Sequence, residues 1–143
     1  MRTPAFWDTS ALVPLCAQQA ITPDVISLYE NHTAVIWWAT PVEIASAIAR
    51  LTRMKQLDAG GRIEARGLAK QLAESWSVIQ PTDAILLMAA QFVDRFELRP
   101  ADSLQLAAAL TWCGEVPEGR LFFSADLKLR DAARRCGFDA IRL

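Results

Sequence analysis

The chain has 143 residues, of which 52% are hydrophobic and 22% charged, a composition that is typical of a globular domain and excludes disordered and fibrous classes. Its formal net charge of −1 excludes a uniformly basic nucleic-acid binder, although twelve of its fifteen cationic residues are arginine, which suits bidentate phosphate contacts. The longest apolar run, residues 84–90, is far shorter than the roughly 20 residues of a membrane-spanning helix. We therefore expect one domain over residues 1–143 and no membrane segment.

Few residues are available for metal binding or nucleophilic chemistry. Cys16, Cys113 and Cys136 are odd in number and form no CxxC pair, which argues against a disulfide framework and a thiolate zinc site. His32 is the only histidine, so histidine metal sites and serine or cysteine triads lack their usual base. Any catalysis must therefore use carboxylates. Because an acid and prolines interrupt the N-terminal apolar stretch, we expect no export signal and a location in the reducing cytoplasm.

The apolar pattern predicts strands that alternate with helices. In chain order we expect a strand over residues 4–8, helices over 11–19 and 22–31, a strand over 34–39, helices over 41–56 and 58–76, a short strand over 77–80, helices over 82–96 and 100–113, a strand over 120–124 and a helix over 126–136. This alternation predicts an α/β fold, a three-layer sandwich in which helices cover both faces of a parallel sheet of four or five short strands.

Two helix starts are predicted from capping residues. Ser10 is the expected N-cap of the first helix, and Pro14 predicts that this helix is kinked or starts late, because a proline ring crowds the preceding turn. Thr40 and Glu43 have the spacing of a capping box, with Thr40 as the N-cap and Glu43 three residues later. On this interpretation, the helix that carries Glu43 leaves the carboxyl end of the second strand.

Acidic residues follow the predicted strands at the edge where parallel sheets bind ligands. Asp8 ends the first strand, Asp126 comes just after the fourth, and Glu43 lies in the first turn of the helix that leaves the second. These three acids are therefore expected to converge. Asp102 begins a helix that follows another helix, so the pattern leaves open whether it faces the cleft or only interacts with the helix dipole.

Several carboxylates in one cleft repel each other and raise one another's pKa values unless a cation joins them. Oxygen ligands with open water positions suit Mg²⁺, or Mn²⁺ as the alternative ion. Such an ion activates water and stabilises the charge that develops when a phosphodiester is cleaved. Phosphoryl chemistry without histidine is therefore the function that the acids indicate.

Four segments of the chain match a known family in order, over nearly its whole length. They are Phe6-Trp7-Asp8-Thr9-Ser10-Ala11-Leu12-Val13, Thr40-Pro41-Val42-Glu43-Ile44-Ala45-Ser46-Ala47, Leu98-Arg99-Pro100-Ala101-Asp102-Ser103-Leu104-Gln105-Leu106-Ala107 and Phe122-Phe123-Ser124-Ala125-Asp126. The sequence resembles PIN-domain nucleases, especially toxins of the VapC type. A single segment would be weak evidence, but four in order are specific.

The resemblance implies a PIN-like fold and a Mg²⁺-dependent ribonuclease whose principal metal ligands are Asp8 and Asp102. The other site residues that it implies are the acids Glu43 and Asp126 and the hydrogen-bonding serines Ser10 and Ser124. It also implies an RNA substrate with structure, an antitoxin partner and homodimerisation. Two positions depart from the family pattern, with Pro14 where relatives often carry lysine and Ser103 where they often carry alanine.

Two other functions fit parts of the pattern. A catalytically silent PIN-like module would bind RNA or a partner without cutting, but all four acids are present here. Aspartyl-phosphate phosphotransferases and haloacid dehalogenase-type hydrolases also place an aspartate at the end of the first strand. The dehalogenase type usually has a second aspartate two residues later, where this chain has Ser10. Phosphoenzyme trapping on Asp8 would support that alternative.

Overall fold

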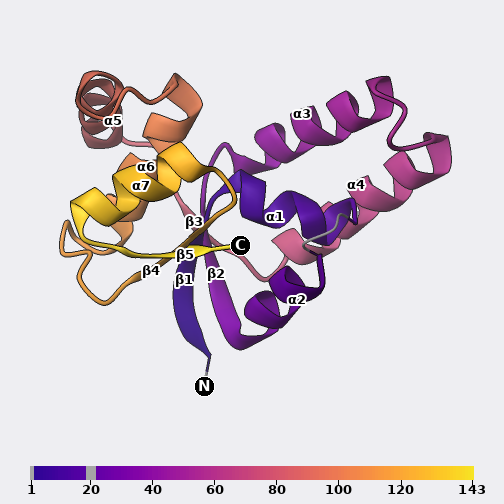
Figure 1. Ribbon diagram of the computed structural model, residues 1–143, viewed down its shortest axis with the longest axis horizontal. Coiled ribbons are helices and arrows are strands. Elements are labelled where there is room, and N and C mark those ends of the chain that lie inside the picture. Colours follow the sequence, from indigo (N-terminus) through magenta and orange to yellow (C-terminus); the bar gives the residue numbers. More distant parts are fainter. Residues whose placement is uncertain (1, 19–21) are drawn as a thin grey trace.

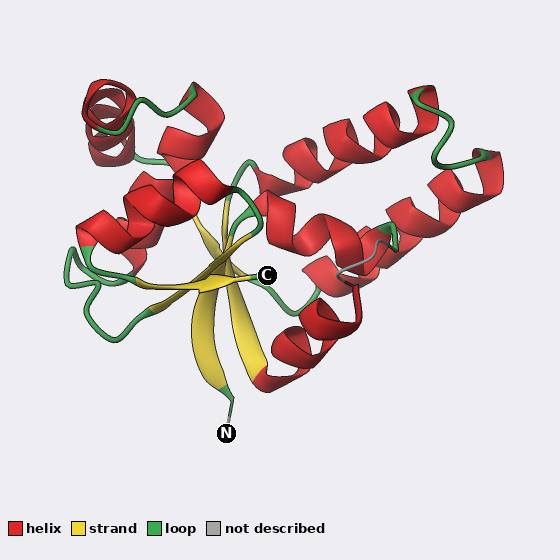
Figure 2. Ribbon diagram, viewed as in Figure 1, coloured by secondary structure: helices red, strands yellow, loops and turns green. Residues whose placement is uncertain are grey.

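The computed structural model describes residues 2–18 and 22–143, which form seven helices and five strands (Figures 1 and 2). In chain order these are β1 (Thr3–Trp7), α1 (Thr9–Cys16), α2 (Thr22–Asn31), β2 (His32–Trp37), α3 (Thr40–Arg53), α4 (Ala59–Ala73), β3 (Ser77–Ile79), α5 (Asp83–Arg95), α6 (Pro100–Trp112), β4 (Leu121–Ser124), α7 (Leu127–Cys136) and β5 (Asp139–Arg142). Every predicted element is present. Gln19, the predicted end of the first helix, lies outside the described residues, and β5 is a strand that the sequence analysis did not place.

The five strands are parallel and form one sheet in the order β3-β2-β1-β4-β5. Phe6 of the central strand β1 is in register with Val35 of β2 on one side and Phe122 of β4 on the other. The chain runs outward from β1 through β2 to β3 and then returns to place β4 on the opposite side of β1. Ligands of open parallel sheets bind beyond the carboxyl ends of the strands at such a reversal. The fold therefore places the best position for a site just after β1 and β4.

Each face of the sheet has its own hydrophobic core, because side chains alternate between the two faces along a strand. Phe6, Val35 and Phe122 pack with residues of α5, α6 and α7, while Trp7 and Phe123 pack with residues of α1 to α4. Figure 2 shows the sheet between these two groups of helices. Burying one such side chain stabilises the fold by about 1.5–3 kcal/mol. The predicted three-layer α/β sandwich is confirmed.

Asp8 is the N-cap of α1, so the prediction that Ser10 caps this helix is wrong. The Asp8 side chain accepts a hydrogen bond from the backbone N–H of Ser10, two residues later. The helix begins at Thr9, well before Pro14, and the predicted late start is also wrong. The reason is that the acid at the strand end already satisfies a free amide of the first turn, so the helix starts at once.

The predicted capping box at the start of α3 is not formed. The N-cap is Ala39, which makes no side-chain capping bond, and Thr40 is the first helical residue. The Thr40 side chain is fully buried and accepts a hydrogen bond from Gln105 instead. The carboxylate of Glu43 is likewise bound by side chains of other helices. Tertiary contacts have therefore replaced the local capping bonds that the spacing predicts.

Helices α3 and α4 pack together as a pair that extends away from the sheet (Figure 1). The start of α3 lies near the carboxyl end of β2, so its first turn is close to the edge where β1 and β4 end. Within residues 2–18 and 22–143, no helix combines the length and the apolarity needed to cross a bilayer.

Candidate active site

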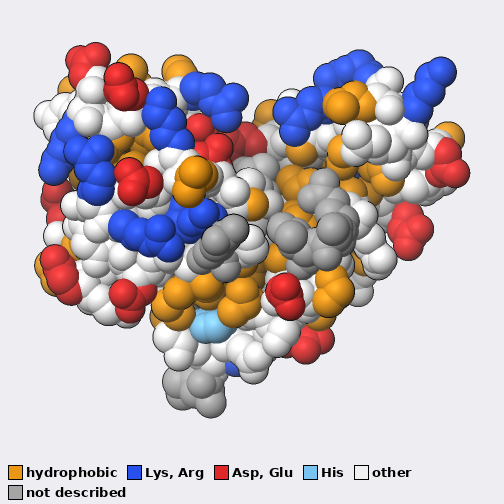
Figure 3. All heavy atoms as spheres, viewed as in Figure 1, with side chains coloured by type: hydrophobic (Ala, Val, Ile, Leu, Met, Phe, Trp, Pro, Cys, Tyr) orange, Lys and Arg blue, Asp and Glu red, His pale blue; other side chains and the backbone are white. Residues whose placement is uncertain are grey.

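The acids predicted from the sequence line one cleft at the carboxyl-end edge of the sheet. Asp8 follows β1 and Asp126 follows β4, while Glu43 and Asp102 lie in the first turns of α3 and α6. All four border a cleft of about 730 Å³. The sequence left the orientation of Asp102 open, and the structure places it with the other three. Figure 3 shows acidic side chains at the notch between the two halves of the molecule, with lysine and arginine side chains on both sides.

Asp8 is the most buried acid of the cleft, with 4% of its surface exposed. Its Oδ1 accepts a hydrogen bond of 3.0 Å from the Ser10 amide, and its Oδ2 accepts hydrogen bonds from the Ser10 and Ser124 hydroxyls. Burial raises the pKa of Asp8 from 3.8 to about 6, against the opposing effect of these hydrogen bonds and with a small addition from the charge of Asp102. A cation beside Asp8 would offset this penalty, because an opposite charge favours the ionised carboxylate.

The two serines connect the end of β1 to the segment that follows β4. The Ser10 hydroxyl accepts a hydrogen bond of 2.9 Å from the amide of Ala125, and the Ser124 hydroxyl accepts one of 3.0 Å from the amide of Asp126. Each hydroxyl also donates to the Asp8 carboxylate. The serines therefore hold Asp8 in a fixed relation to the backbone at Asp126.

Glu43 reaches the cleft from α3 and is held through one of its two oxygens. Its Oε1 accepts hydrogen bonds from the Thr9 hydroxyl at 2.8 Å and from Nε2 of Gln105 at 2.6 Å. Burial raises the pKa of Glu43, these hydrogen bonds lower it, and the charge of Asp102 adds to the rise. Within the described part of the chain, the hydrogen bonds of this carboxylate end on Oε1, which leaves Oε2 available to a ligand.

Asp102 and Asp126 share an arginine. Nε of Arg99 lies 3.4 Å from Oδ2 of Asp102, and Nη2 of Arg99 lies 4.0 Å from Oδ2 of Asp126. Burial and the charge of Asp126 raise the pKa of Asp102, and Arg99 lowers it. The Arg99 side chain is 80% exposed, and both Arg99 and Arg50 line the cleft. The cleft therefore combines carboxylates with two cationic side chains that can contact a phosphate.

The donors fit Mg²⁺ or Mn²⁺ better than other common ions. All four are carboxylates, and oxygen ligands are what these ions prefer. In the parts of the chain that the structure describes, no three acidic, histidine or cysteine side chains lie close enough to hold an ion by themselves. Mg²⁺ usually takes one or two protein carboxylates and completes its shell with water or phosphate oxygens. The arrangement suits such an ion and does not suit a protein-only calcium or zinc cage.

Comparison with known proteins identifies the fold. No family model matches the sequence, and no curated protein is similar enough in sequence to match it. Among solved structures, a chain of a "Toxin-antitoxin complex from Klebsiella pneumoniae" aligns with a TM-score of 0.62 over 85% of this chain and 86% of that chain. The two chains share a fold. Their sequences are 13% identical, so the likeness concerns the arrangement of helices and strands alone.

Sequence reasoning missed three side chains that contact the acids. Thr9 and Gln105 bind Glu43, and Arg99 bridges Asp102 and Asp126. Gln105 carried a usable signal, because it is the polar residue in the otherwise apolar run of α6 over residues 104–110. Thr9 and Arg99 carried none, because the contact of Thr9 with Glu43 and that of Arg99 with Asp126 depend on the tertiary fold.

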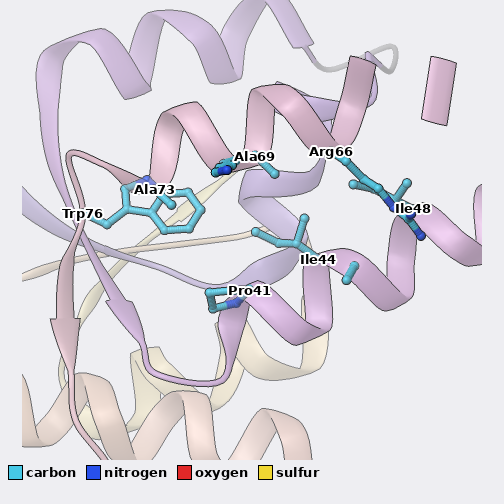
Figure 4. Close-up of a pocket in the computed structure, with 9 residues that line it drawn as sticks. Pro41, Ile44, Ile48, Arg66, Ala69, Ala73 and Trp76 are labelled. Atoms are coloured by element: carbon cyan, nitrogen blue, oxygen red, sulfur yellow. The ribbon is translucent and has the colours of Figure 1, made fainter. Parts of the chain in front are cut away.

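A second concavity lies between α3 and α4, away from the acids (Figure 4). It has a volume of about 370 Å³. Its apolar walls come from Ile44 and Ile48 of α3 on one side, and from Ala69 and Ala73 of α4 with Trp76, which follows α4, on the other. Its cationic lining residues are Arg66 and Lys70. This groove is apolar with a basic rim, in contrast to the acidic cleft.

Proposed function

We propose that this chain is a Mg²⁺-dependent endoribonuclease and the toxin of a toxin-antitoxin pair, with Mn²⁺ as the alternative ion. The observation that carries the proposal is the convergence of Asp8, Glu43, Asp102 and Asp126 from four different elements on one cleft. Burying Asp8 costs stability, as its raised pKa indicates, so the fold keeps a charged group where an apolar one would be more stable. Costly groups of this kind gather at functional sites.

We assign the roles of the residues from the resemblance to PIN-domain nucleases. Asp8 and Asp102 would be the principal metal ligands, with Glu43 and Asp126 completing the site directly or through water. A bound Mg²⁺ supplies Lewis-acid chemistry, which stabilises charge on phosphate oxygens and activates water. Ser10 keeps the Asp8 carboxylate oriented. Ser124 also donates a hydrogen bond to the Asp8 carboxylate. Arg50 and Arg99 line the cleft and would bind phosphate groups of the RNA.

The test is RNA cleavage by the purified protein with Mg²⁺, with Mn²⁺ and with excess EDTA. We expect cleavage only with a metal ion. The Asp102→Asn variant should fold but not cleave RNA, because a side-chain amide is a poor metal ligand. Asp94→Asn, which makes the same charge change at an exposed position of α5, is the matched control and should cleave normally. Undiminished cleavage in EDTA would overturn the proposal. RNA binding without cleavage in any condition would favour the silent binding module.

The antitoxin is the second part of the proposal. A solved structure that shares the fold belongs to a toxin-antitoxin complex, which supports a protein partner for this chain. The groove between α3 and α4 combines apolar walls with Arg66 and Lys70 (Figure 4). Charge complementarity therefore favours an amphipathic helix with acidic residues beside its apolar face. Homodimerisation, a structured RNA target and a cytoplasmic location stay predictions.

Co-expression with the product of the adjacent gene tests this partner. Expression of the wild-type chain alone should slow growth, and the partner should restore it. Ala73→Arg places a bulky cation in the groove and away from the acids, so the variant should remain toxic but escape the partner. Glu74→Arg, a change of charge at the exposed neighbouring position, should still be neutralised. If Ala73→Arg were neutralised as well as wild type, the groove would not be the docking site.

A further inference from the structure

Gln105 is buried at the meeting point of three helices. It lies on α6 with 1% of its surface exposed. Its Nε2 is 2.6 Å from Oε1 of Glu43, 3.0 Å from the hydroxyl of Thr9 and 3.1 Å from the hydroxyl of Thr40. The Thr9 hydroxyl donates in turn to the same oxygen of Glu43 at 2.8 Å. The network therefore ends on one oxygen of the Glu43 carboxylate.

The environment of Gln105 is unfavourable for an amide. The next five residues of α6, from Leu106 to Leu110, are all buried and aliphatic. The Oε1 atom of Gln105 is buried and has no hydrogen-bond partner in the described residues. A buried carbonyl without a partner destabilises the fold, and an aliphatic side chain of similar size would avoid this cost. Gln105 is therefore poorly explained as a residue that serves the core.

The position of Gln105 on α6 links it to both walls of the cleft. Asp102 lies three residues earlier on the same helix, and residues with this spacing lie on neighbouring positions of one helical face. Helix α6 therefore carries Asp102 at the cleft and also holds Glu43 of α3 through the hydrogen bond from Gln105. With Oε1 fixed in this way, the orientation of the other oxygen of Glu43 is also fixed.

We infer that Gln105 is a positioning residue of the proposed nuclease, which sets the place of the Glu43 carboxylate relative to Asp102. The inference rests on the proposed function, because it assigns Gln105 a role toward the metal and the RNA through Glu43. Groups that orient metal ligands are worth about 10–100-fold in metal affinity or activity. A purely structural role, tying α6 to α1 and α3, would instead affect folding stability and leave metal affinity unchanged.

The test compares Gln105→Met with wild type. Methionine has a similar size and is apolar, so it keeps the packing and removes the hydrogen bonds. We expect Mn²⁺ binding, measured by calorimetry without RNA, to weaken by about 10-fold or more, and kcat to fall with little change in the KM for RNA. The melting temperature without metal should be unchanged or higher, because the unpaired carbonyl is gone. In the Glu43→Gln background, Gln105→Met should have little further effect on either measurement.

The matched control is Ser103→Ala. Ser103 is another fully buried polar residue of α6 whose hydroxyl has no hydrogen-bond partner in the described residues. Its substitution should leave Mn²⁺ affinity and kcat unchanged. If Gln105→Met does not fold, Thr9→Val at a half-buried position removes the second hydrogen bond to Glu43 and should shift Mn²⁺ affinity in the same direction.

The outcomes separate this inference from the function on which it rests. If wild type cleaves RNA and binds Mn²⁺, but Gln105→Met and Thr9→Val bind the ion as wild type does, the positioning role is overturned and the proposed function stands. A lower melting temperature with unchanged metal affinity would overturn the positioning role in the same way. If wild type itself neither cleaves RNA nor binds Mn²⁺, both proposals fall together.

Discussion

The carboxylates of Asp8 and Asp126 each accept a hydrogen bond from a backbone amide, whereas those of Glu43 and Asp102 are contacted, among the described residues, by side chains. The first pair follows β1 and β4, and each carboxylate caps the helix that comes next. The second pair lies in the first turns of α3 and α6, whose N-caps, Ala39 and Arg99, make no side-chain capping bond. The acids after the strands therefore serve both the fold and the cleft. The acids on the helices cap no helix: Glu43 is held by Thr9 and Gln105, which are distant in the chain, and Asp102 is held by Arg99, three residues earlier.

The pH dependence of stability gives the largest expected effect. Because the folded-state pKa of Asp8 is about 6 and its ordinary value is 3.8, the folded protein binds more protons than the unfolded chain between these values. The free energy of unfolding should therefore fall as the pH rises through this window, by about 3 kcal/mol at most. Asp8→Asn keeps a side-chain oxygen for the cap and removes this dependence.

Urea unfolding in EDTA at pH 4.5 and pH 7 measures the effect. The free energy of unfolding of Asp8→Asn relative to that of wild type should be higher at pH 7 than at pH 4.5. At pH 7 the variant should melt several degrees above wild type. Millimolar Mg²⁺ should narrow or reverse the gap, because wild type binds the ion in its folded state and the variant has lost a ligand. If the difference in the free energy of unfolding between Asp8→Asn and wild type were the same at both pH values, the ionised Asp8 carboxylate would not destabilise the fold.

Alanine substitutions compare the two kinds of acid directly. Asp126 accepts a hydrogen bond of 2.8 Å from the amide of Leu129, so Asp126→Ala should lower the free energy of unfolding by about 1 kcal/mol. Asp102→Ala removes a repulsive charge and no cap, and it should be neutral or stabilising. Both are measured by urea unfolding at pH 7 in EDTA. Equal losses in the two variants would remove the distinction between backbone-held and side-chain-held acids.

The smallest expected effect concerns Arg99, the exposed cation that bridges one acid of each kind. A metal ion must compete with this guanidinium for Asp102 and Asp126, so Arg99→Gln should tighten Mn²⁺ binding. Exposed ion pairs contribute less than about 1 kcal/mol, which corresponds to about a two- to fivefold change in affinity. Arg66→Gln on α4 makes the same change in net charge outside the cleft and should leave Mn²⁺ affinity unaltered. Weaker binding in Arg99→Gln would contradict the competition.

The sequence predicts the part of this molecule that depends on local patterns. Phe6, Trp7 and Asp8 are recognisable because a buried strand and the acid after it are adjacent in the chain, and the same holds for the segment from Phe122 to Asp126. The layered fold follows from such alternation. β5 was missed because it is short and carries charged residues at both ends.

The remainder of the candidate site depends on distant contacts. Asp102 could not be placed because its helix follows another helix, and only the packed fold orients its first turn toward the cleft. The Thr40 and Glu43 pattern predicts a capping box, but Gln105, more than sixty residues later, binds both side chains. A local pattern cannot reveal that a distant residue competes for the same hydrogen bonds.

The backbone of Asp8 also continues the ladder of the sheet. Its amide donates a hydrogen bond of 3.1 Å to the carbonyl of Phe123, beyond the last paired residue of β1. This amide lies between the central strand β1 and its neighbour β4, so it should exchange its hydrogen with solvent only when the domain as a whole unfolds. Hydrogen exchange at the Asp8 amide therefore reports global unfolding. In the native state, this part of the cleft is formed before any ligand binds. A molecule that binds in the cleft must therefore fit the rigid backbone at Asp8. Only the exposed side chains around the cleft can change conformation to fit it.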